Sequence, residues 1–505
     1  MHDYIAKIQA AQIYDLAIET PINAAPLLSH RLGNDVLLKR EDLQPVFSFK
    51  LRGAYNKLMH LSPEQRARGV IAASAGNHAQ GVAMAADKMG IQATIVMPKT
   101  TPAIKIDAVR ARGAKVVLVG DSFDVAAEHA SALVAAQGLV YIHPFDDPDV
   151  IVGQGTIGME IHRQLSAPLD AIFIAVGGGG LCAGIAVYLK QMWPKIKIIA
   201  VESDDAACLD AALRCGHPVT LPEVGIFADG TAVARIGEHP FKILKHLVDS
   251  VITVTTDEIC AAIKDTFNET RAICEPSGAM GLAGLKKYVA DTGIHGQSLL
   301  AVQCGANIDF DRLRYISERT QTGEKREAIL AVVIDERPGS FKAFCTALEQ
   351  RNISEFNYRY ARSDAAQIFA GVQVSGDHDR HALVADLATK GYSVEDMTDN
   401  EMAKLHIRHM VGGRAPQVGE EQVYRFDFPE RPGALLNFLN LLGDSWNISM
   451  FHYRNHGSAF GRVLVGLQAT ADEQGAIGRF LDTLNYRYVD ETNNPAYRLF
   501  LSDGD

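Results

Sequence analysis

The sequence predicts an α/β protein in which a long part with parallel sheets precedes two small, related α/β modules. Two observations carry this prediction. Between residues 69 and 309, short continuous apolar runs alternate with helical segments, as in parallel sheets covered by helices on both faces. After residue 320 this pattern stops, and three blocks of sequence occur twice in the same order.

The first part is expected to open with an amphipathic helix in MHDYIAKIQAAQIYDL, residues 1–16, because its apolar residues recur at helical spacing. The expected strands are GVIAAS (69–74), QATIVMP (92–98), AKVVLVG (114–120), LDAIFIAV (169–176), KIIAVES (197–203) and LLAVQ (299–303). The expected helices are 76–90, closed by Gly90, then 102–113, 122–138 and one starting near Leu181.

The repeat defines the last third of the chain. ERPGSFKAF at 336–344 returns as ERPGALLNF at 430–438, NISEFNYR at 352–359 returns as NISMFHYR at 447–454, and GVQV at 371–374 returns as GLQA at 466–469. Each copy is expected to fold as strand, RPG turn, helix, strand, strand. TGEKRE (322–327) and GGRAPQVGEE (412–421) are expected to be linkers. These features predict a first part at 1–320 with a smaller subdomain at about 41–144, and modules at 328–400 and 421–493.

Composition narrows the class of protein. The chain has 505 residues and a net charge of −11 without a Lys/Arg run, which argues against binding to nucleic acid or anionic membrane. No apolar run approaches a membrane span, and the start lacks the pattern of a secretory signal. The seven cysteines are scattered and form no CxxC pair, which disfavours a disulfide framework or zinc site and suggests a reducing cytoplasm.

Lys50 is the first candidate for chemistry. In FSFKLRG (47–53) a strand or loop would bury its stem among Phe47, Phe49 and Leu51. One interpretation is that the ammonium simply reaches water past apolar neighbours. The other is that partial desolvation lowers the pKa of the amine and makes it a nucleophile.

Gly177–Gly180, between a strand and a helix, are the second candidate. Four residues without Cβ allow backbone N–H groups to converge on an anion at the positive end of the helix, and a phosphate fits there. A close-packed turn is the alternative. VGGGGLCAG lacks the GxGxxG spacing, but Glu202 follows about where a ribose-binding acid would lie, so a dinucleotide site stays open.

Two further motifs complete the set. SAGNHAQG (74–81) begins a helix, and its N–H groups with the side chains of Ser74, Asn77 and His78 suit a carboxylate, although an empty helix start is equally compatible. QCGAN (303–307) ends a strand, and Cys304 alone would usually be a buried apolar residue. Pyridoxal phosphate would use the lysine, the phosphate cradle, the carboxylate loop and the strand end together, with Lys50 forming its Schiff base.

The chain resembles the fold-type-II (tryptophan synthase β-like) pyridoxal-phosphate enzymes, and among them the biosynthetic threonine ammonia-lyases, or threonine dehydratases. The resemblance lies in four motifs and their order: SFKLRGAYN, SAGNHAQG, GGGGL and CGAN. The resemblance covers essentially the whole chain, since that family carries two C-terminal ACT-like regulatory modules. It implies deamination of L-threonine, and also of L-serine, to a 2-oxo acid and ammonia, as the first committed step of isoleucine biosynthesis. It implies that the cofactor contacts Lys50, Phe49, Asn77, Gly177, Gly178, Gly179, Gly180, Leu181 and Cys304. It implies that the substrate contacts Ser74, Ala75, Gly76, Asn77 and His78.

The resemblance also implies a cytoplasmic homotetramer that isoleucine inhibits and valine relieves. The equivalent Tyr358 and Tyr453 of the two copies are candidate allosteric residues, with core packing as the alternative. No metal is expected, because Cys208 stands where relatives with a cation site have an acid after Glu202. Serine racemase, serine dehydratase and threonine synthase are rivals on the same fold. An NAD-dependent oxidoreductase and a non-catalytic amino-acid sensor are rivals of other classes.

Overall fold

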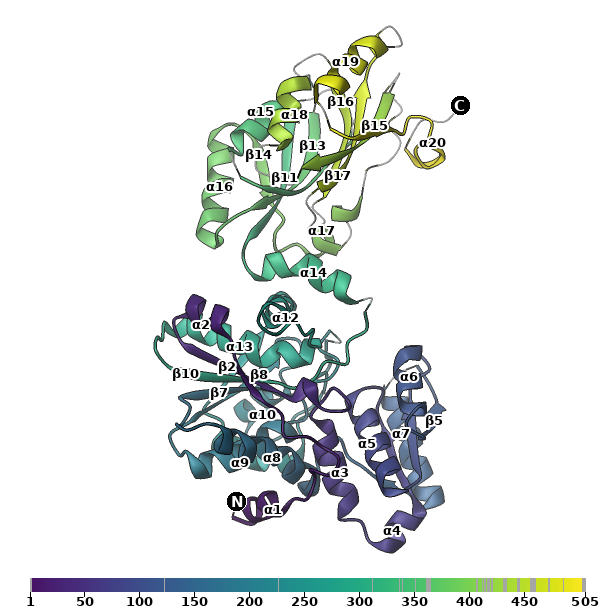
Figure 1. The fold of residues 1–505 in the computed structure, drawn as a ribbon, viewed down its shortest axis with the longest axis vertical. Coiled ribbons are helices and arrows are strands. Elements are labelled where there is room, and N and C mark those ends of the chain that lie inside the picture. The colour runs from purple at the N-terminus through teal and green to yellow at the C-terminus, as the bar shows by residue number, and fades with distance from the viewer. Residues whose placement is uncertain are drawn as a thin grey trace. The chain divides into compact units, whose positions relative to one another are not determined.

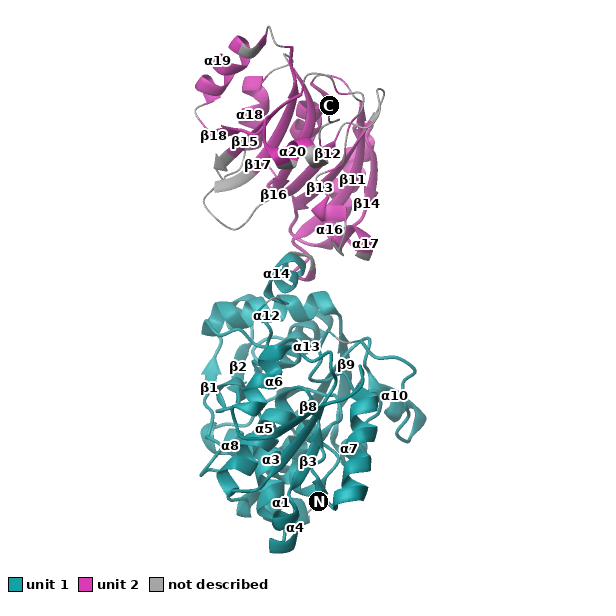
Figure 2. Cartoon of the chain, turned by 90° about the vertical axis from the view of Figure 1, so that its right-hand side faces the viewer, with its two compact units in different colours: residues 1–320 teal, residues 321–505 magenta. Residues whose placement is uncertain are grey.

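The chain forms two compact units, residues 1–320 and 321–505, which Figure 2 colours separately. The computed structural model describes all residues except 1, 122, 226, 311, 336, 338, 350, 360–364, 406, 411, 413, 414, 416, 417, 419, 420, 430–433, 443–445, 455–459, 471, 472, 485 and 502–505. Within the described residues, no helix has both the length and the apolar character needed to cross a bilayer.

The larger sheet of the first unit has six strands in the order β1-β2-β10-β7-β8-β9. Figure 1 labels β2, β10, β7 and β8 of this sheet. All its neighbouring strands are parallel except the antiparallel pair β1–β2. The strands are β1 (Ile22–Ala24), β2 (Asp35–Arg40), β7 (Ala171–Ala175), β8 (Lys197–Ser203), β9 (Ser250–Val254) and β10 (Ser298–Gln303). Every residue of β7 is buried, as its unbroken apolar run predicts.

The smaller sheet of this unit has four parallel strands in the order β5-β4-β3-β6. They are β3 (Val70–Ala73), β4 (Ala93–Met97), β5 (Lys115–Leu118) and β6 (Val140–Tyr141). The two parallel sheets confirm the α/β class predicted for the first part. The six expected strands all form, three in each sheet.

The helices of the first unit follow the predicted alternation. They are α1 (His2–Ala10), α2 (Pro26–Leu32), α3 (Lys50–Met59), α4 (Pro63–Arg68), α5 (Asn77–Met89), α6 (Ala103–Arg110), α7 (Phe123–Gln137), α8 (Pro148–Gln164), α9 (Gly180–Met192), α10 (Cys208–Cys215), α11 (Glu238–Leu247), α12 (Thr256–Thr270), α13 (Pro276–Thr292) and α14 (Arg312–Gly323), with a 3₁₀ turn η1 (Glu41–Leu43). Gly90 ends α5 with φ of 64°, as expected. The first helix is shorter than predicted, because the chain turns after Ala10 and Leu16 N–H donates to Ile13 O.

A fully buried ionic cluster joins β2, η1, α3 and α8. Arg52 donates to Glu41 (Nε–Oε2, 2.7 Å) and to Glu160 (Nη1–Oε1, 2.5 Å). Lys39 Nζ donates to the other oxygen of Glu160 at 2.7 Å. All four side chains have no exposed surface, and their two positive and two negative charges balance. The cluster holds the first turn of α3, which begins at Lys50.

The second unit has one antiparallel sheet of eight strands in the order β14-β11-β13-β12-β16-β17-β15-β18. Its strands are β11 (Glu327–Asp335), β12 (Ile353–Arg359), β13 (Ala365–Gln373), β14 (Ser393–Asp396), β15 (Glu421–Pro429), β16 (Asn447–Arg454), β17 (Phe460–Gln468) and β18 (Tyr488–Asp490). Its helices are α15 (Ser340–Ala347), α16 (Asp377–Thr389), α17 (Glu401–Leu405), α18 (Ala434–Leu442), α19 (Gln474–Leu484) and α20 (Pro495–Phe500), with a 3₁₀ turn η2 (Ile407–His409).

The predicted repeat is a structural repeat. The two copies meet where β12 pairs with β16, so that Tyr358 lies opposite Phe451. Equivalent hydrogen bonds recur in both copies, since Ile329 N–H donates to Thr398 Oγ1 and Val423 N–H donates to Thr492 Oγ1, each at 3.0 Å. Each copy also continues with a helix and a strand beyond the predicted elements, namely α16 and β14, then α19 and β18.

Both expected linkers are shorter than predicted, because residues at their ends belong to helices or strands. In TGEKRE, residues 322–323 end α14 and Glu327 begins β11. Glu327 is buried in the sheet, where Ser354 Oγ donates to its carboxylate and Arg408 lies 3.6 Å away. These partners compensate the buried charge, so a charged residue can belong to the strand here. In the second stretch, Glu421 begins β15, while most of 412–420 and of the RPG turns lies outside the described residues.

Candidate active site and regulatory pocket

Lys50 is the first residue of α3, and its amine is held among protein groups. Nζ donates to the carbonyl oxygen of Pro144 at 2.9 Å and lies 5.3 Å from the centre of the Phe49 ring. Burial lowers the pKa of the amine to about 8, against opposing contributions from Cys304 and Glu275. The expectation that Phe47 helps to bury this lysine is wrong. Phe47 is 54% exposed, with φ of 56°, in a turn before the helix.

The glycine loop connects β7 to α9, as predicted, and it is tightly packed. Gly179 has φ of 89°. A Cβ at Gly178 would lie 2.1 Å from the Phe145 ring, so no other residue fits there. Within the described chain, none of the backbone N–H groups of Gly177–Leu181 donates to a protein acceptor. These buried donors at the start of a helix form a cradle for an anion.

Ser74–Gly76 follow β3, and Asn77 begins α5. Gly76 N–H donates to Ser74 Oγ at 3.3 Å, and nothing lies within 4 Å of a Cβ built on Gly76, so this side of the loop is open. His78 is different, because its ring is buried and Nε2 lies 2.8 Å from the carbonyl oxygen of Ile142. Burial, aided by the charge of Lys50, lowers the pKa of His78 to about 3, so the imidazole is neutral.

Asn77 belongs to a polar triangle with two residues far along the chain. Its Nδ2 donates to Glu275 Oε1 at 2.6 Å, and its Oδ1 accepts from Asn307 Nδ2 at 2.6 Å. Asn307 N–H donates to Glu275 Oε2 at 3.0 Å. Nothing in the sequence singled out Glu275. Asn307 ends the QCGAN motif, which was the available signal for its place in the site.

Cys304 is 3% exposed and its Sγ donates to the carbonyl oxygen of Ser277 at 3.3 Å. Burial raises the pKa of the thiol well above its usual range, so the group stays neutral. The segment after β10 runs beside the segment that leads into α3, because Phe49 N–H donates to Cys304 O at 3.3 Å and Ala306 N–H to Phe47 O at 2.9 Å. This pairing brings Cys304 to Lys50.

Glu202 and Cys208, which stand where some relatives hold a cation, both make contacts within the protein. The two carboxylate oxygens of Glu202 accept from the N–H groups of Leu209 and Asp210 at 2.8 and 2.9 Å. Cys208 Sγ donates to the carbonyl oxygen of Gly177 at 3.3 Å. Across the described residues, no cluster of three or more His, Cys, Asp or Glu side chains could hold a metal ion.

The arrangement fits one class of cofactor. The site combines the half-buried amine of Lys50, whose pKa is lowered, with the neutral thiol of Cys304 at a strand end. It also has the N–H groups of Gly177–Leu181 and the open loop at the start of α5. A family profile described as pyridoxal-phosphate dependent enzyme matches residues 13–305, more than half of the chain. The chain belongs to the pyridoxal-phosphate-dependent enzymes, and pyridoxal phosphate is its cofactor.

More specific similarities place the chain within that class. A profile described as the C-terminal regulatory domain of threonine dehydratase matches twice, at 318–407 and 412–501. The biosynthetic L-threonine dehydratases of Burkholderia multivorans and Escherichia coli K12 are each 52% identical over 99% of this chain and 99% and 97% of their own. The solved structure of the processed form of threonine deaminase isoform 2 from Solanum lycopersicum superposes with a TM-score of 0.62, at 52% identity, over 63% of this chain and 92% of that one. The chain therefore belongs to the biosynthetic threonine dehydratases, which confirms the resemblance seen in its motifs.

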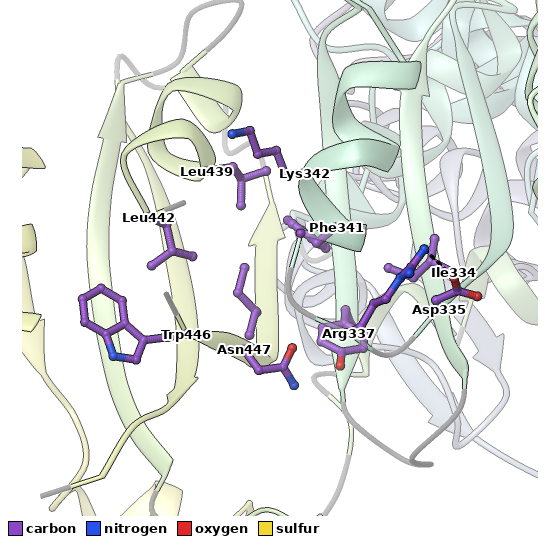
Figure 3. A pocket seen from close by; sticks show the side chains of 12 residues that line it. Ile334, Asp335, Arg337, Phe341, Lys342, Leu439, Leu442, Trp446 and Asn447 are labelled. Carbon is purple, nitrogen blue, oxygen red and sulfur yellow. Dashed lines mark ion pairs between the residues drawn. The ribbon is translucent and has the colours of Figure 1, made fainter. Parts of the chain in front are cut away.

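A pocket lies in the second unit where its two copies meet (Figure 3). Its lining residues are Ile334, Asp335, Arg337, Gly339, Phe341, Lys342, Tyr358, Leu439, Leu442, Trp446, Asn447 and Ile448. One copy contributes the end of β11 and the start of α15, while the other contributes α18 and the start of β16. In Figure 3 the ion pair Asp335–Arg337 (3.1 Å) stands on one side, with Leu442 and Trp446 on the other.

The two candidate allosteric tyrosines differ in position. Tyr358 lines this pocket and is 5% exposed, with its ring centre 6.4 Å from that of Phe341. Tyr453 lies opposite Phe356 on the neighbouring strand and packs on the core of the sheet without lining the pocket. Both therefore take part in packing where the copies join.

Proposed function

We propose that this chain converts L-threonine, and L-serine more slowly, to the 2-oxo acid and ammonia at the site around Lys50. For threonine the product is 2-oxobutanoate, and the step commits threonine to isoleucine biosynthesis. The observation that carries the proposal is the lowered pKa of the Lys50 amine beside the open loop 74–78 and the free N–H cradle of Gly177–Leu181. Membership of the biosynthetic threonine dehydratases supplies the substrate.

Five groups of residues would hold the cofactor. Lys50 would carry it covalently, Phe49 would flank it, and Asn77 would donate to its 3′-oxygen. The N–H groups of Gly177–Leu181 would bind its phosphate, and Cys304 would face its ring nitrogen. The bound cofactor supplies an electron sink for the electrons left on the substrate when Cα loses its proton.

The chain's own residues supply binding and proton transfer. The loop 74–78 at the positive end of α5 would bind the substrate carboxylate through its N–H groups and the Ser74 hydroxyl. Lys50 Nζ would take the Cα proton as a general base, since a pKa of about 8 leaves part of the amine neutral near pH 7.5. The neutral Cys304 thiol adds no charge beside the ring, and neutral His78 adds none beneath the loop.

A direct assay tests the activity. The purified full chain with pyridoxal phosphate should release ammonia and 2-oxobutanoate from L-threonine in equal amounts, with a higher kcat/KM than for L-serine. Release of D-serine from L-serine, or reduction of NAD, without a 2-oxo acid would point to the rival enzymes. If the protein bound threonine without converting it, it would be a non-catalytic amino-acid sensor and not a threonine dehydratase.

We also propose that the pocket of the second unit binds isoleucine, and valine in competition with it. The ammonium and carboxylate of an amino acid would pair with the exposed side chains of Asp335 and Arg337. A branched aliphatic side chain would contact Phe341, Leu439 and Leu442. Tyr358 lines this pocket, and Tyr453 would mark the corresponding position of the other copy. Allostery then requires that each effector prefers one conformational state.

Tryptophan fluorescence tests this assignment on the full chain. Trp446 lines the pocket, and Trp193 is the other of the two tryptophans, so Trp193→Phe leaves a single reporter there. Isoleucine should change its fluorescence saturably, and Arg337→Gln should weaken that binding about tenfold or more. The matched control is Arg326→Gln, another exposed arginine paired with a nearby acid outside the pocket. Equal isoleucine affinity in both variants would contradict the assignment.

We propose that the enzyme is cytoplasmic, because free cysteines suit a reducing compartment. We also propose that it is a homotetramer, so that sedimentation equilibrium should give four times the chain mass. We retain limits of about 41–144 for the smaller subdomain, and of 328–400 and 421–493 for the regulatory modules. Limited proteolysis between the modules tests those limits.

A further inference from the structure

Glu275 is a buried carboxylate in the active site for which the proposed reaction has no use. It precedes α13 in the N-cap position, with 3% of its surface exposed. Its side chain does not cap the helix, whereas Thr255 caps α12 with its hydroxyl. The carboxylate instead accepts from Asn77 Nδ2 at 2.6 Å and from Asn307 N–H at 3.0 Å. A Cβ at Gly305 would lie 2.3 Å from Glu275 Oε1, so the chain keeps space for this contact.

These contacts determine how the Asn77 amide is turned. An ionised carboxylate only accepts hydrogen bonds, so the atom facing Glu275 must be the amide nitrogen. The amide oxygen then faces Asn307 Nδ2, which donates to it at 2.6 Å. Turning the amide over would set two acceptors against each other on one side and two donors on the other. The NH₂ group carries two hydrogens, and only one is used by Glu275, so the other is available to a further acceptor.

The same contacts join the parts of the first unit that are built around its smaller and its larger sheet. Asn77 begins α5, which follows a strand of the smaller sheet. Glu275 precedes α13, a helix that packs on β7 and β10 of the larger sheet, and Asn307 lies shortly after β10. The partners of Asn77 are 198 and 230 residues away along the chain. The position of Asn77 relative to Cys304 and the glycine loop therefore depends on this triangle.

We propose that Glu275 is a positioning residue whose carboxylate orients the Asn77 amide so that its remaining N–H is directed to the 3′-oxygen of the cofactor. This inference rests on the proposed function, which places the cofactor at Lys50 and its 3′-oxygen at Asn77. Glu275 itself need not touch the substrate or the cofactor.

The inference includes a dependence on pH. Burial, and then the charge of Asp229, raise the pKa of Glu275 to about 7, while its bonds with Asn77 and Asn307 and the charge of Lys105 oppose the rise. The other titratable groups near it are Lys50, Cys304 and Cys274. Above about pH 7 the carboxylate accepts from both donors. Below it the added proton turns one acceptor into a donor, and the Asn77 amide is held less firmly.

A double-mutant cycle on the full chain tests the inference. Apoprotein is titrated with pyridoxal phosphate, and the visible absorbance and circular dichroism report cofactor affinity and orientation. Glu275→Gln should weaken cofactor affinity about tenfold in the native background but less than twofold in an Asn77→Ala background. Glu269→Gln is the matched control, because Glu269 also accepts from a backbone N–H, that of Leu28, away from this site. It should leave cofactor affinity unchanged.

Equal losses in both backgrounds, or no loss in either, would overturn the inference. A second measurement needs no variant of Glu275 and decides the case if Glu275→Gln fails to fold. The visible circular dichroism of the native holoenzyme should change with a midpoint near pH 7, and Asn77→Ala should abolish that change. A signal that is constant from pH 6 to 8, or that persists in Asn77→Ala, contradicts the inference. Failure of the proposed function is distinct, since the cofactor would then not be attached to Lys50 in the native protein.

Discussion

The buried ionic cluster beneath Lys50 makes a quantitative prediction for Arg52→Leu. The substitution removes a guanidinium that donates to both oxygens of Glu41 and both oxygens of Glu160. Glu160 keeps Lys39 at 2.7 Å, whereas Glu41 keeps only uncharged donors, among them Thr20 Oγ1. Removing one partner of a buried ion pair costs about 3–5 kcal/mol, because the other charge stays buried without compensation. We expect a loss in this range, against a total stability of about 5–15 kcal/mol for a typical protein.

The assay follows unfolding of the first unit within the full chain. In a Trp446→Phe background, Trp193 is the only tryptophan and lies in the first unit, so its fluorescence in urea reports that unit. The control is Arg163→Leu on α8. Arg163 and its partner Glu19 are each about half exposed, so their ion pair contributes about 0–1 kcal/mol to stability. A loss below about 1 kcal/mol for Arg52→Leu, comparable to the control, would refute the reasoning.

Further predictions concern the reaction and its control. Lys50→Ala should fold but lose threonine deamination by more than about 10³-fold, and a variant that kept a tenth of the activity would exclude Lys50 as the base. Because only the neutral amine attacks an aldehyde, cofactor attachment to the apoprotein should speed up with pH and level off above about 8; a rise continuing to pH 10 would indicate an ordinary lysine. Cys304→Asp should increase side transamination relative to elimination, and an unchanged product ratio with an unchanged spectrum would separate residue 304 from the ring. A chain truncated near residue 320 should stay active without isoleucine inhibition, and inhibition at the same isoleucine concentration would move the effector site to the first unit. Tyr358→Ala should weaken isoleucine inhibition while leaving uninhibited turnover nearly unchanged, whereas equal inhibition would leave Tyr358 a packing residue.

The parts of the fold that depend on local pattern were predictable. Continuous apolar runs such as 171–175 became buried parallel strands, and the four glycines after them became the turn into α9. The repeated blocks predicted two related modules, but not the helix and strand that complete each one, because the sequences of α16 and α19 have diverged. The local surroundings of Lys50 were misjudged at Phe47, since a positive φ in a turn is not evident from an apolar side chain.

The parts that depend on long-range contacts were not predictable from one sequence. Glu275 contacts Asn77, which is 198 residues away along the chain. In the sequence, a glutamate before a proline indicates only an ordinary helix start. The pairing of β12 with β16, which brings together the two sides of the pocket in the second unit, depends on the edges of two separate modules meeting. Pattern identifies which residue types belong to a site, whereas the fold decides which of them are neighbours.

Chemical trapping shows directly whether pyridoxal phosphate is attached to Lys50. The full chain, saturated with pyridoxal phosphate, is reduced with borohydride, digested and analysed by mass spectrometry. We expect the yellow colour to be lost and one phosphopyridoxyl group to be found, on the peptide that contains Lys50. A modified lysine elsewhere with Lys50 unmodified, or no stable modification of any lysine, would contradict it.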